Sequence, residues 1–443
     1  MSRNLGFSVT AVLLSVSILL TACGAPTAAQ APSKDHPIQL RIGIQMTPTE
    51  LQTWTPLLDS IAQKHPEWII VEEQTPQSSG NEKLNANAAA GTMPDVQELE
   101  GVPDVLSQGA FLPLDDYVTQ SGIDKSDFFP NVLGMYTSQG HLMALPFVAS
   151  PEVLYYNMDK FDAAKLPYPT NSWTMADFEK AAILLTLDNK GRNPTDPNFD
   201  SKNITQWGFN TNPGSMGSWA TPTFLQPWGG TFCANPDCTQ LKMLTPANEI
   251  ALNFWYDLVV TNHASLSDPY SGAQTGVPGD PFISGFTAMG YDGYFAVGEL
   301  KTTTTIRFGI VQPPLGPSGH GSGLSARGYA IAKNSKYPDE AWKLIQELTT
   351  TDFLTNMWTL SGNSVPARRS AAKALTQLKA PPADLSGVLM AAEYASPFVP
   401  LGPGSVEAYI KTSAIGVDIF SGKLSIQDGY TQMEQVGNAA LQP

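Results

Sequence analysis

The segment from residue 144 to residue 159, ALPFVASPEVLYYNMD, constrains the fold of this chain more than any other stretch. Residues 153–156 form a short apolar run, rich in aromatic and β-branched side chains, between Pro151 and Asn157. Such a run is too short for a helix and is typical of a buried strand. Because one α/β pattern precedes it and another follows it, we expect this strand to pass between two lobes, with the residues just before it facing a cleft.

Strand and helix patterns alternate before this segment. Residues 38–45 alternate between apolar and polar, as in a strand, and apolar residues within 51–61 recur at helical spacing. A second strand pattern, at residues 68–71, completes a βαβ unit. Such units build parallel sheets, whose ligands lie beyond the carboxyl ends of the strands. We therefore expect residues 45–49 and 97–100 at one rim of a binding site.

Similar patterns continue to the end of the chain. Predicted helices span residues 174–185, 338–348 and 350–360, and predicted strands span residues 307–311 and 328–332. The Gly- and Pro-rich stretch 313–325 is expected to return the chain to the first lobe, and residues 367–370 to cross a third time. The tail is expected to be helical and to belong to the second lobe.

The N-terminus has the features of an export signal. Arg3 precedes an apolar run at residues 7–20, which is too short to span a bilayer but suits a signal-peptide core. The small residues before Cys23 resemble the bacterial lipobox, which implies a signal peptide over residues 1–22 and lipid on the sulfur of Cys23. Residues 23–37 would then form a flexible tether that holds the protein at the membrane. The alternative is an ordinary signal peptide with an unrelated cysteine.

Charge and composition narrow the classes of partner. The chain has 443 residues, of which 42% are hydrophobic and 15% charged, and these values are typical of a globular protein. A formal net charge of −15 argues against a nucleic-acid partner, which requires clustered Lys and Arg. We interpret the acidity as favouring solubility rather than as an acidic active site.

Two cysteines remain after Cys23, in the sequence TFCANPDCTQ. Turn-forming residues separate Cys233 from Cys238, so a structural disulfide that closes a hairpin is the expected state in an exported protein. A zinc site is the alternative, but no second Cys or His pair lies nearby.

Signatures of catalysis are absent from the sequence. It contains no phosphate-binding loop, no H-E-x-x-H and no G-x-S-x-G, and we predict neither enzymatic activity nor a cofactor or metal. The polar loop at residues 188–200 offers oxygen ligands for Ca²⁺ but lacks the spacing of an EF-hand, so a solvated loop is expected.

Aromatic residues in loops are the remaining candidates for ligand binding. Trp219 and Trp228 lie in stretches rich in Gly, Pro and Ser, where binding residues concentrate. An aromatic face can pack against the C–H face of a sugar ring while polar groups bind its hydroxyls. The other interpretation of any tryptophan is core packing, which we expect for Trp255 and Trp342 on amphipathic helices.

The sequence GHLMALPFVASPEVLYYNMDKF, followed by Pro169 and Trp173 at a helix start, resembles the crossover segment of sugar-type (family 1) extracellular solute-binding proteins of ABC importers. This resemblance implies an α/β, periplasmic-binding-protein-like (type II) fold with two lobes, each a sheet flanked by helices, joined by crossover hinge segments. It implies one lobe from residues 38–147 plus 324–366 and a second from 148–323 plus 367–443.

The resemblance also implies where ligand-binding residues lie. Four segments match those that approach the ligand in this family: PDVQELEG, SPEVLYYN, FTAMGYDGYF and LSARGYAIA, with GNSVP as the closing segment. Together with the loop tryptophans, the expected ligand-binding residues are Gln97, Glu98, Glu100, Ser150, Glu152, Tyr155, Trp219, Trp228, Gly293, Tyr294, Phe295, Arg327, Gly328 and Trp358.

The function implied is capture of an extracellular solute, a mono- or oligosaccharide, in the cleft between the lobes and delivery to the transmembrane permease subunits of an ABC transporter. The protein would be a monomer, anchored by lipid to the outer face of the bacterial cell membrane. Two alternatives stay open. The same fold could bind a polyol phosphate, a peptide or a polyamine, or two cleft carboxylates could make the protein a surface glycoside hydrolase.

Overall fold

The computed structural model describes residues 32–75, 80–101, 106, 109–210, 221–235, 238–266, 274–276, 279–303, 306–359, 362, 364–378, 382, 384–397 and 404–441. The strands are β1 Ile38–Ile44, β2 Trp68–Gln74, β3 Val96–Glu100, β4 Thr137–Ser138, β5 His141–Leu142, β6 Leu145–Asn157, β7 Leu187–Asp188, β8 Ile204–Asn210, β9 Ser265–Leu266, β10 Thr287–Gly293, β11 Phe308–Val311, β12 Leu324–Ile331 and β13 Val365–Pro366. The α-helices are α1 Pro48–Lys64, α2 Gly80–Ala90, α3 Asp115–Gln120, α4 Pro130–Met135, α5 Met158–Ala164, α6 Met175–Leu185, α7 Thr221–Leu225, α8 Pro246–Tyr256, α9 Val297–Thr303, α10 Pro338–Leu348, α11 Thr351–Leu354, α12 Arg369–Ala372, α13 Ser386–Tyr394, α14 Ser405–Phe420 and α15 Ile426–Ala440.

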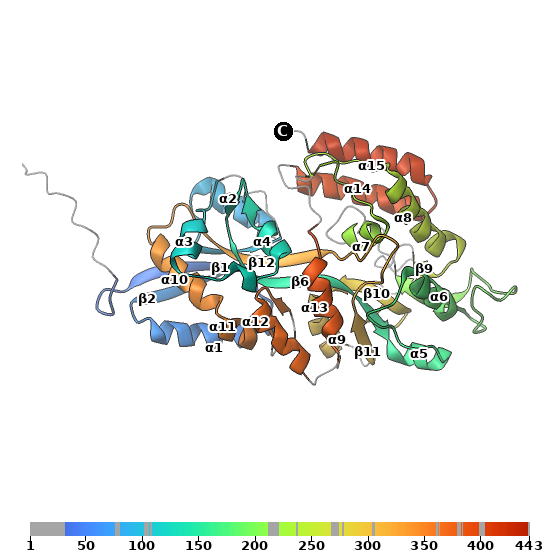
Figure 1. Ribbon diagram of the computed structural model, residues 1–443, viewed down its shortest axis with the longest axis horizontal. Coiled ribbons are helices and arrows are strands. Elements are labelled where there is room, and N and C mark those ends of the chain that lie inside the picture. Colours follow the sequence, from blue (N-terminus) through green and yellow to red (C-terminus); the bar gives the residue numbers. More distant parts are fainter. Residues whose placement is uncertain are drawn as a thin grey trace, which may run out of the picture.

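Strand β6 runs from one half of the molecule to the other (Figure 1). All 13 of its residues are buried. Its first half pairs antiparallel with β12, up to Pro151, and its second half pairs antiparallel with β10, from Glu152 onward. Proline interrupts a strand least where the ladder changes partner, because its missing N–H is then not needed. The predicted strand between two α/β patterns is therefore confirmed, and it is longer than the apolar run alone indicated.

The two halves of the molecule have the layered α/β construction that the sequence predicted. In the first, β2, β1 and β3 are parallel neighbours, β12 joins β3 antiparallel, and α1 and α10 pack on this sheet. In the second, β10 lies between β6 and β8, with α6, α8, α14 and α15 around it (Figure 1). The strand order β2-β1-β3-β12-β6-β10-β8-β7 therefore runs continuously through both halves.

Two hydrophobic cores accompany the two halves. The first gathers side chains of α1, β1, β3, α10, β12, α12 and α13, and the second those of α6, β8, α8, α14 and α15. The tail helices thus pack in the second core, whereas α12 and α13 pack in the first. The lobe boundaries at residues 147/148, 323/324 and 366/367 stay a prediction.

Helix α1 starts at a cavity, where a capping box fixes its N-terminus. Thr47 Oγ1 accepts a hydrogen bond from the Glu50 amide, and Glu50 Oε2 accepts one from the Thr47 amide, which makes a capping box. Trp54, Leu58 and Ile61 form its buried stripe. This arrangement fixes the first turn of α1, and with it the direction of the Glu50 side chain.

The helix predicted at residues 350–360 is only partly regular. Residues Thr351–Leu354 form α11, and Thr355–Thr359 continue as a π-helical turn. The described residues include no helix that is both long and apolar enough to cross a membrane. The predicted signal peptide and Cys23 lie outside the described residues.

Candidate functional site

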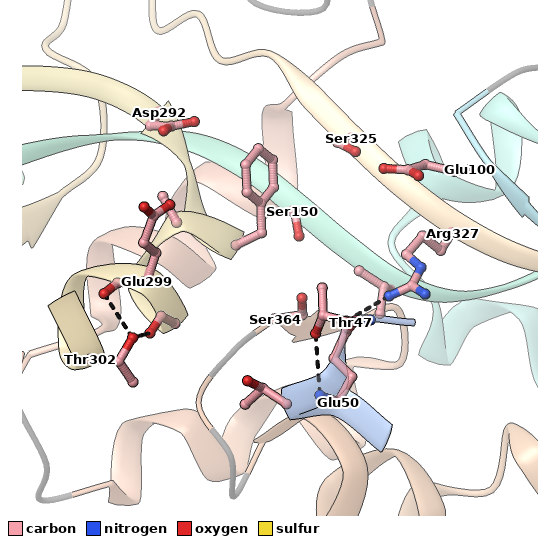
Figure 2. Close-up of a pocket in the computed structure, with 15 residues that line it drawn as sticks. Thr47, Glu50, Glu100, Ser150, Asp292, Glu299, Thr302, Ser325, Arg327 and Ser364 are labelled. Atoms are coloured by element: carbon pink, nitrogen blue, oxygen red, sulfur yellow. Dashed lines mark hydrogen bonds and ion pairs between the residues drawn. The ribbon is translucent and has the colours of Figure 1, made fainter. Parts of the chain in front are cut away.

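A cavity of about 510 Å³ lies where the first sheet meets β10 and α9 (Figure 2). Its lining combines hydroxyl groups, carboxylates, one guanidinium and one aromatic ring. The lining residues are Thr47, Thr49, Glu50, Glu100, Val148, Ser150, Asp292, Phe295, Ala296, Gly298, Glu299, Thr302, Ser325, Arg327 and Ser364. A volume in the range of 300–1,000 Å³ is typical of small-molecule sites, so the cavity is large enough for a sugar of one or two rings.

Three serines form the floor of this cavity. Ser150 lies on β6, Ser325 is its register partner on β12, and Ser364 immediately precedes β13, which also pairs with β6. Figure 2 shows their hydroxyl groups along the inner face of the cavity. The site is thus centred on the strands that pass between the halves.

Arg327 forms one wall, and the protein itself binds most of its guanidinium. Nε donates to Glu98 Oε1 at 2.6 Å, Nη1 to Glu50 Oε1 at 2.8 Å, and Nη2 to the Gln45 carbonyl at 2.6 Å. Nη2 is also paired with Glu98. Of the five N–H groups, one on Nη1 therefore remains without an acceptor among the described residues and is available to a ligand.

Electrostatic and aromatic contacts keep Arg327 charged and in place. Burial alone would lower its pKa, but the carboxylates of Glu98 and Glu50 raise it above the ordinary value of arginine. The guanidinium carbon lies 5.5 Å from the centre of the Phe147 ring and 5.2 Å from that of the Trp358 ring. Both rings stabilise the guanidinium through cation–π contacts, and neither ring accepts its remaining N–H group.

The opposite wall comes from β10 and the turn that leads into α9. Phe295 is 45% exposed and lines the cavity. A Cβ at Gly293 would collide with the Phe295 ring, so glycine is required for this ring position. Asp292 accepts a hydrogen bond from the Gly293 amide at 2.7 Å. Burial, reinforced by repulsion from Asp280, raises the pKa of Asp292 to about 7.

Four of the residues predicted to bind ligand line this cavity: Glu100, Ser150, Phe295 and Arg327. The remaining predicted residues that the structure describes do not line it. Gln97, Glu98 and Gly328 lie behind the first wall, where Glu98 is fully buried against Arg327. A Cβ at Gly328 would approach the Tyr136 ring at 3.1 Å, which explains the glycine by packing.

The predicted aromatic residues are mainly core residues. Trp228 packs against Phe254, with ring centres 4.8 Å apart, and Trp358 is 1% exposed beneath Arg327. Tyr294 is fully buried, and Tyr155 is 2% exposed, with its hydroxyl donating to the Gly293 carbonyl at 3.0 Å. Packing within the protein therefore accounts for these rings better than stacking on a ligand does. Trp219 lies outside the described residues.

Glu152 is buried beside the cavity rather than in it. Its carboxylate accepts a hydrogen bond from the Thr223 hydroxyl, and its backbone amide donates to the Gly323 carbonyl at 2.8 Å. Burial raises the pKa of Glu152 to about 8, although the Thr223 hydrogen bond lowers it. Glu152 therefore joins β6 to the segment before β12 and to α7.

Sequence reasoning missed several lining residues of the second half. Asp292, Glu299 and Thr302 follow no motif, and only the match of the neighbouring Gly293 to the family pattern pointed to this region. Ser325 and Ser364 lie inside segments that were expected at the cleft, and Thr47 inside the expected rim. In the part of the chain that the structure describes, no three His, Cys, Asp or Glu side chains are grouped so as to hold a metal ion.

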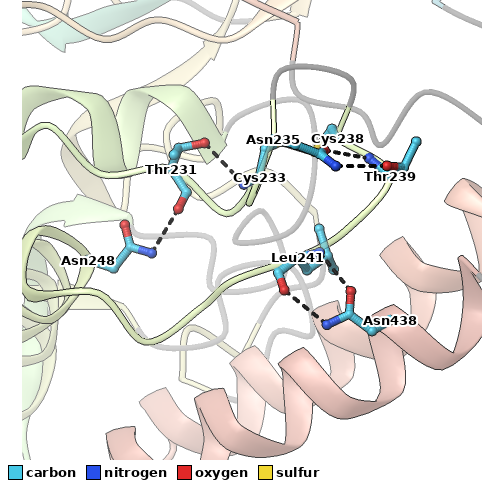
Figure 3. Close-up of a disulfide and its surroundings, with 8 residues drawn as sticks. All are labelled: Thr231, Cys233, Asn235, Cys238, Thr239, Leu241, Asn248 and Asn438. Carbon is cyan, nitrogen blue, oxygen red and sulfur yellow. Dashed lines mark hydrogen bonds between the residues drawn. A yellow bond between two sulfur atoms is a disulfide. The ribbon is translucent and has the colours of Figure 1, made fainter.

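Cys233 and Cys238 form a disulfide (Figure 3), and neither residue lines the cavity. The loop that follows is tied to the last helix, since the Leu241 amide donates to Asn438 Oδ1 at 2.7 Å and Asn438 Nδ2 donates to the Leu241 carbonyl at 2.9 Å. The disulfide therefore belongs to the scaffold of the second half.

Comparisons with known proteins agree with this architecture. A 139-residue stretch is 34% identical to the sn-glycerol-3-phosphate-binding periplasmic protein UgpB of Escherichia coli (strain K12), over 27% of this chain and 31% of the relative. The chain thus spans about a third of the length of this curated relative.

Solved structures share the fold over nearly the whole chain. UspC of M. tuberculosis aligns with a TM-score of 0.75 at 19% identity, over 91% of this chain and 100% of that one. The ABC substrate-binding protein Lmo0181 from Listeria monocytogenes, in complex with cycloalternan, aligns with a TM-score of 0.74 at 18% identity, over 91% and 98%. At these identities the likeness shows the two-lobe fold. Residues 57–353, more than half of the chain, match the family described as bacterial extracellular solute-binding protein, and the chain belongs to this family.

Proposed function

We propose that the cavity binds a mono- or oligosaccharide and that the protein delivers this solute to the permease of an ABC importer. The observation that carries the proposal is the composition of the cavity. Hydroxyls and carboxylates surround it, and one ring, Phe295, is 45% exposed on its wall. Directed polar groups together with an aromatic surface match the two kinds of surface that a sugar presents.

The position of the cavity supports capture by closure. Its lining comes from α1, β3 and β12 on one side and from β10 and α9 on the other. A solute that contacts both sides stabilises the closed arrangement and not the open one. A shift from mostly open to mostly closed requires about 5.5 kcal/mol of differential binding, which several buried hydrogen bonds at about 1 kcal/mol each and one stacked ring can supply.

The charge of the lining disfavours a phosphate-bearing solute. The name of the relative UgpB refers to sn-glycerol-3-phosphate. Here, Arg327 is the single basic residue of the described lining, and Glu98 and Glu50 already neutralise it. A phosphate would lie among carboxylates without a free cation, which costs binding energy. A neutral sugar meets no such repulsion.

Isothermal titration calorimetry with a panel of mono- and oligosaccharides tests the proposal. We expect micromolar or tighter binding of at least one of them, lost in Ser150→Leu because the larger side chain fills the floor. The exposed Ser60→Leu on α1 is the matched control, because it lies outside the cavity. Absence of binding by the whole panel would overturn the sugar assignment. Unchanged oligosaccharide after long incubation would support a carrier, whereas released reducing ends would favour the hydrolase.

Lipid attachment at Cys23, a monomeric state and docking to permease subunits complete the proposal. The lipobox-like residues before Cys23 support the anchor, and the tether of residues 23–37 would let the closed protein reach a permease in the same membrane. We expect wild-type protein expressed in bacteria to fractionate with membranes and Cys23→Ser to be released into the soluble fraction. Equal membrane association of both would contradict the anchor.

A further inference from the structure

We propose that the solute carries a protonated amine in addition to its hydroxyl groups, as in an amino sugar. This inference rests on the proposed function and narrows its substrate class. It follows from two independent features of the cavity: unsatisfied hydroxyls on its floor and an excess of carboxylates on its walls.

The first feature shows that the floor is built for a ligand. Ser150 is 3% exposed and Ser364 is 4% exposed, and neither side chain has a hydrogen-bond partner among the described residues. Both line the cavity, and Figure 2 shows them facing it. Their hydroxyl groups are not among the buried polar atoms without a partner, so they are open to the cavity and can bind a solute there. A solute on the floor supplies the missing partners.

The second feature is the charge balance of the walls. The lining contains Glu50, Glu100, Asp292 and Glu299, with Arg327 as the single basic residue among the lining residues described. Arg327 is shared by Glu50 and the buried Glu98 behind it, so it offers little charge to Glu100 and Asp292. Glu100 has no cation within ion-pair distance among the described residues, and Asp292 accepts only its neighbouring amide.

The positions of these two carboxylates define what would fit between them. Glu100 ends β3 on one side of the cavity, and Asp292 lies on β10 on the other, with the floor serines between them (Figure 2). An ammonium group can donate to a carboxylate while adjacent sugar hydroxyls bind the serines. A cation bound to both walls also removes the repulsion that opposes their approach. The net charge of −15 would attract such a solute from solution.

Matched sugars test the inference. Calorimetry at pH 7, where Asp292 with its pKa of about 7 is partly ionised, would compare glucosamine with glucose and N-acetylglucosamine, and the disaccharide of glucosamine with cellobiose and N,N′-diacetylchitobiose. We expect the amines to bind about tenfold or more tightly, as when charge-assisted hydrogen bonds replace neutral ones. We expect 0.5 M NaCl and Glu100→Gln each to reduce this preference, whereas Glu249→Gln, on an exposed part of α8, leaves it unchanged.

The outcomes separate this inference from the proposed function. Equal or tighter binding of the neutral sugars overturns the inference and leaves the proposed function intact. A preference for amines that survives both high salt and Glu100→Gln also overturns it, because the carboxylates would then not be its cause. Failure of every sugar to bind overturns the proposed function and this inference together.

Discussion

At the scale of single residues, Arg327 links the scaffold to the site. In Arg327→Met, Glu98 keeps its buried position but loses its counter-charge, and breaking a buried pair in this way costs about 3–5 kcal/mol. Arg307, whose side chain is 56% exposed and pairs with Asp159 and Asp162, is the matched control. We expect Arg307→Met to cost only about 0–1 kcal/mol. Urea denaturation measures the unfolding free energy of both variants. Equal losses of stability in the two would contradict the interpretation of Arg327 as the counter-charge of a buried carboxylate.

Glu152 predicts how stability depends on pH. Because burial raises its pKa from 4.5 to about 8, the native state retains a proton that the unfolded state releases between these values. Its contribution to the free energy of unfolding is therefore complete below about pH 4.5 and is lost as the pH rises to about 8, by at most about 1.4 kcal/mol per pH unit. Asp292, with its pKa raised to about 7, acts in the same direction.

The variant Glu152→Gln tests this dependence, because glutamine resembles the protonated acid at every pH. Between pH 5 and pH 8 we expect its unfolding free energy to fall less steeply than that of the wild type, and the difference between the two to widen with pH. Asp59→Asn, on the exposed side of α1, should keep the wild-type slope. Parallel curves for Glu152→Gln and wild type would refute the raised pKa.

Site residues were predictable from sequence where strand order decides their position. Glu100 ends a strand of a parallel unit, so the rim argument predicted its position, whereas Ser150 and Arg327 were expected at the cleft from the family resemblance of their segments. The roles of aromatic residues were less predictable. The sequence around Trp228 and Tyr294 would look the same whether the side chain packs in a core or contacts a ligand. The presence of Asp292 and Glu299 in the cavity depends on how β10 and α9 are placed relative to the first sheet. No local sequence pattern contains this information.

At the scale of elements, the local sequence pattern predicted the helices and strands whose own residues favour that structure. Helices α1, α6 and α10 begin and end within a few residues of the predicted positions, because their caps and apolar stripes agree. Strand β10, TAMGYDG, contains two glycines and an aspartate, which disfavour strands. It forms because β6 and β8 pair with it on both sides. Tertiary pairing of this kind has no signal in the segment itself.

The disulfide allows a prediction at the same scale. It closes a loop with a sequence separation of 5, and in the chain-entropy account so short a loop contributes about 2 kcal/mol. We expect the double variant Cys233→Ser, Cys238→Ser to lose about this amount in urea denaturation, with unchanged solute affinity because neither residue lines the cavity. Reductant should destabilise the wild type and leave the double variant unaffected. A large loss of affinity would instead mean that the loop contributes to the site.

At the scale of the whole molecule, the proposed closure predicts a change of shape. The serines of the floor lie on segments that pair with or belong to β6, while the walls belong to opposite sides, so bending of the crossing segments would change the separation of the walls more than the floor. We expect saturating solute to reduce the radius of gyration measured by small-angle X-ray scattering. Ser150→Leu, with its floor filled, should keep the ligand-free value in the presence of solute. An unchanged radius of gyration for wild type that calorimetry shows to be saturated would contradict closure, because binding would then occur in a cavity whose walls do not approach each other.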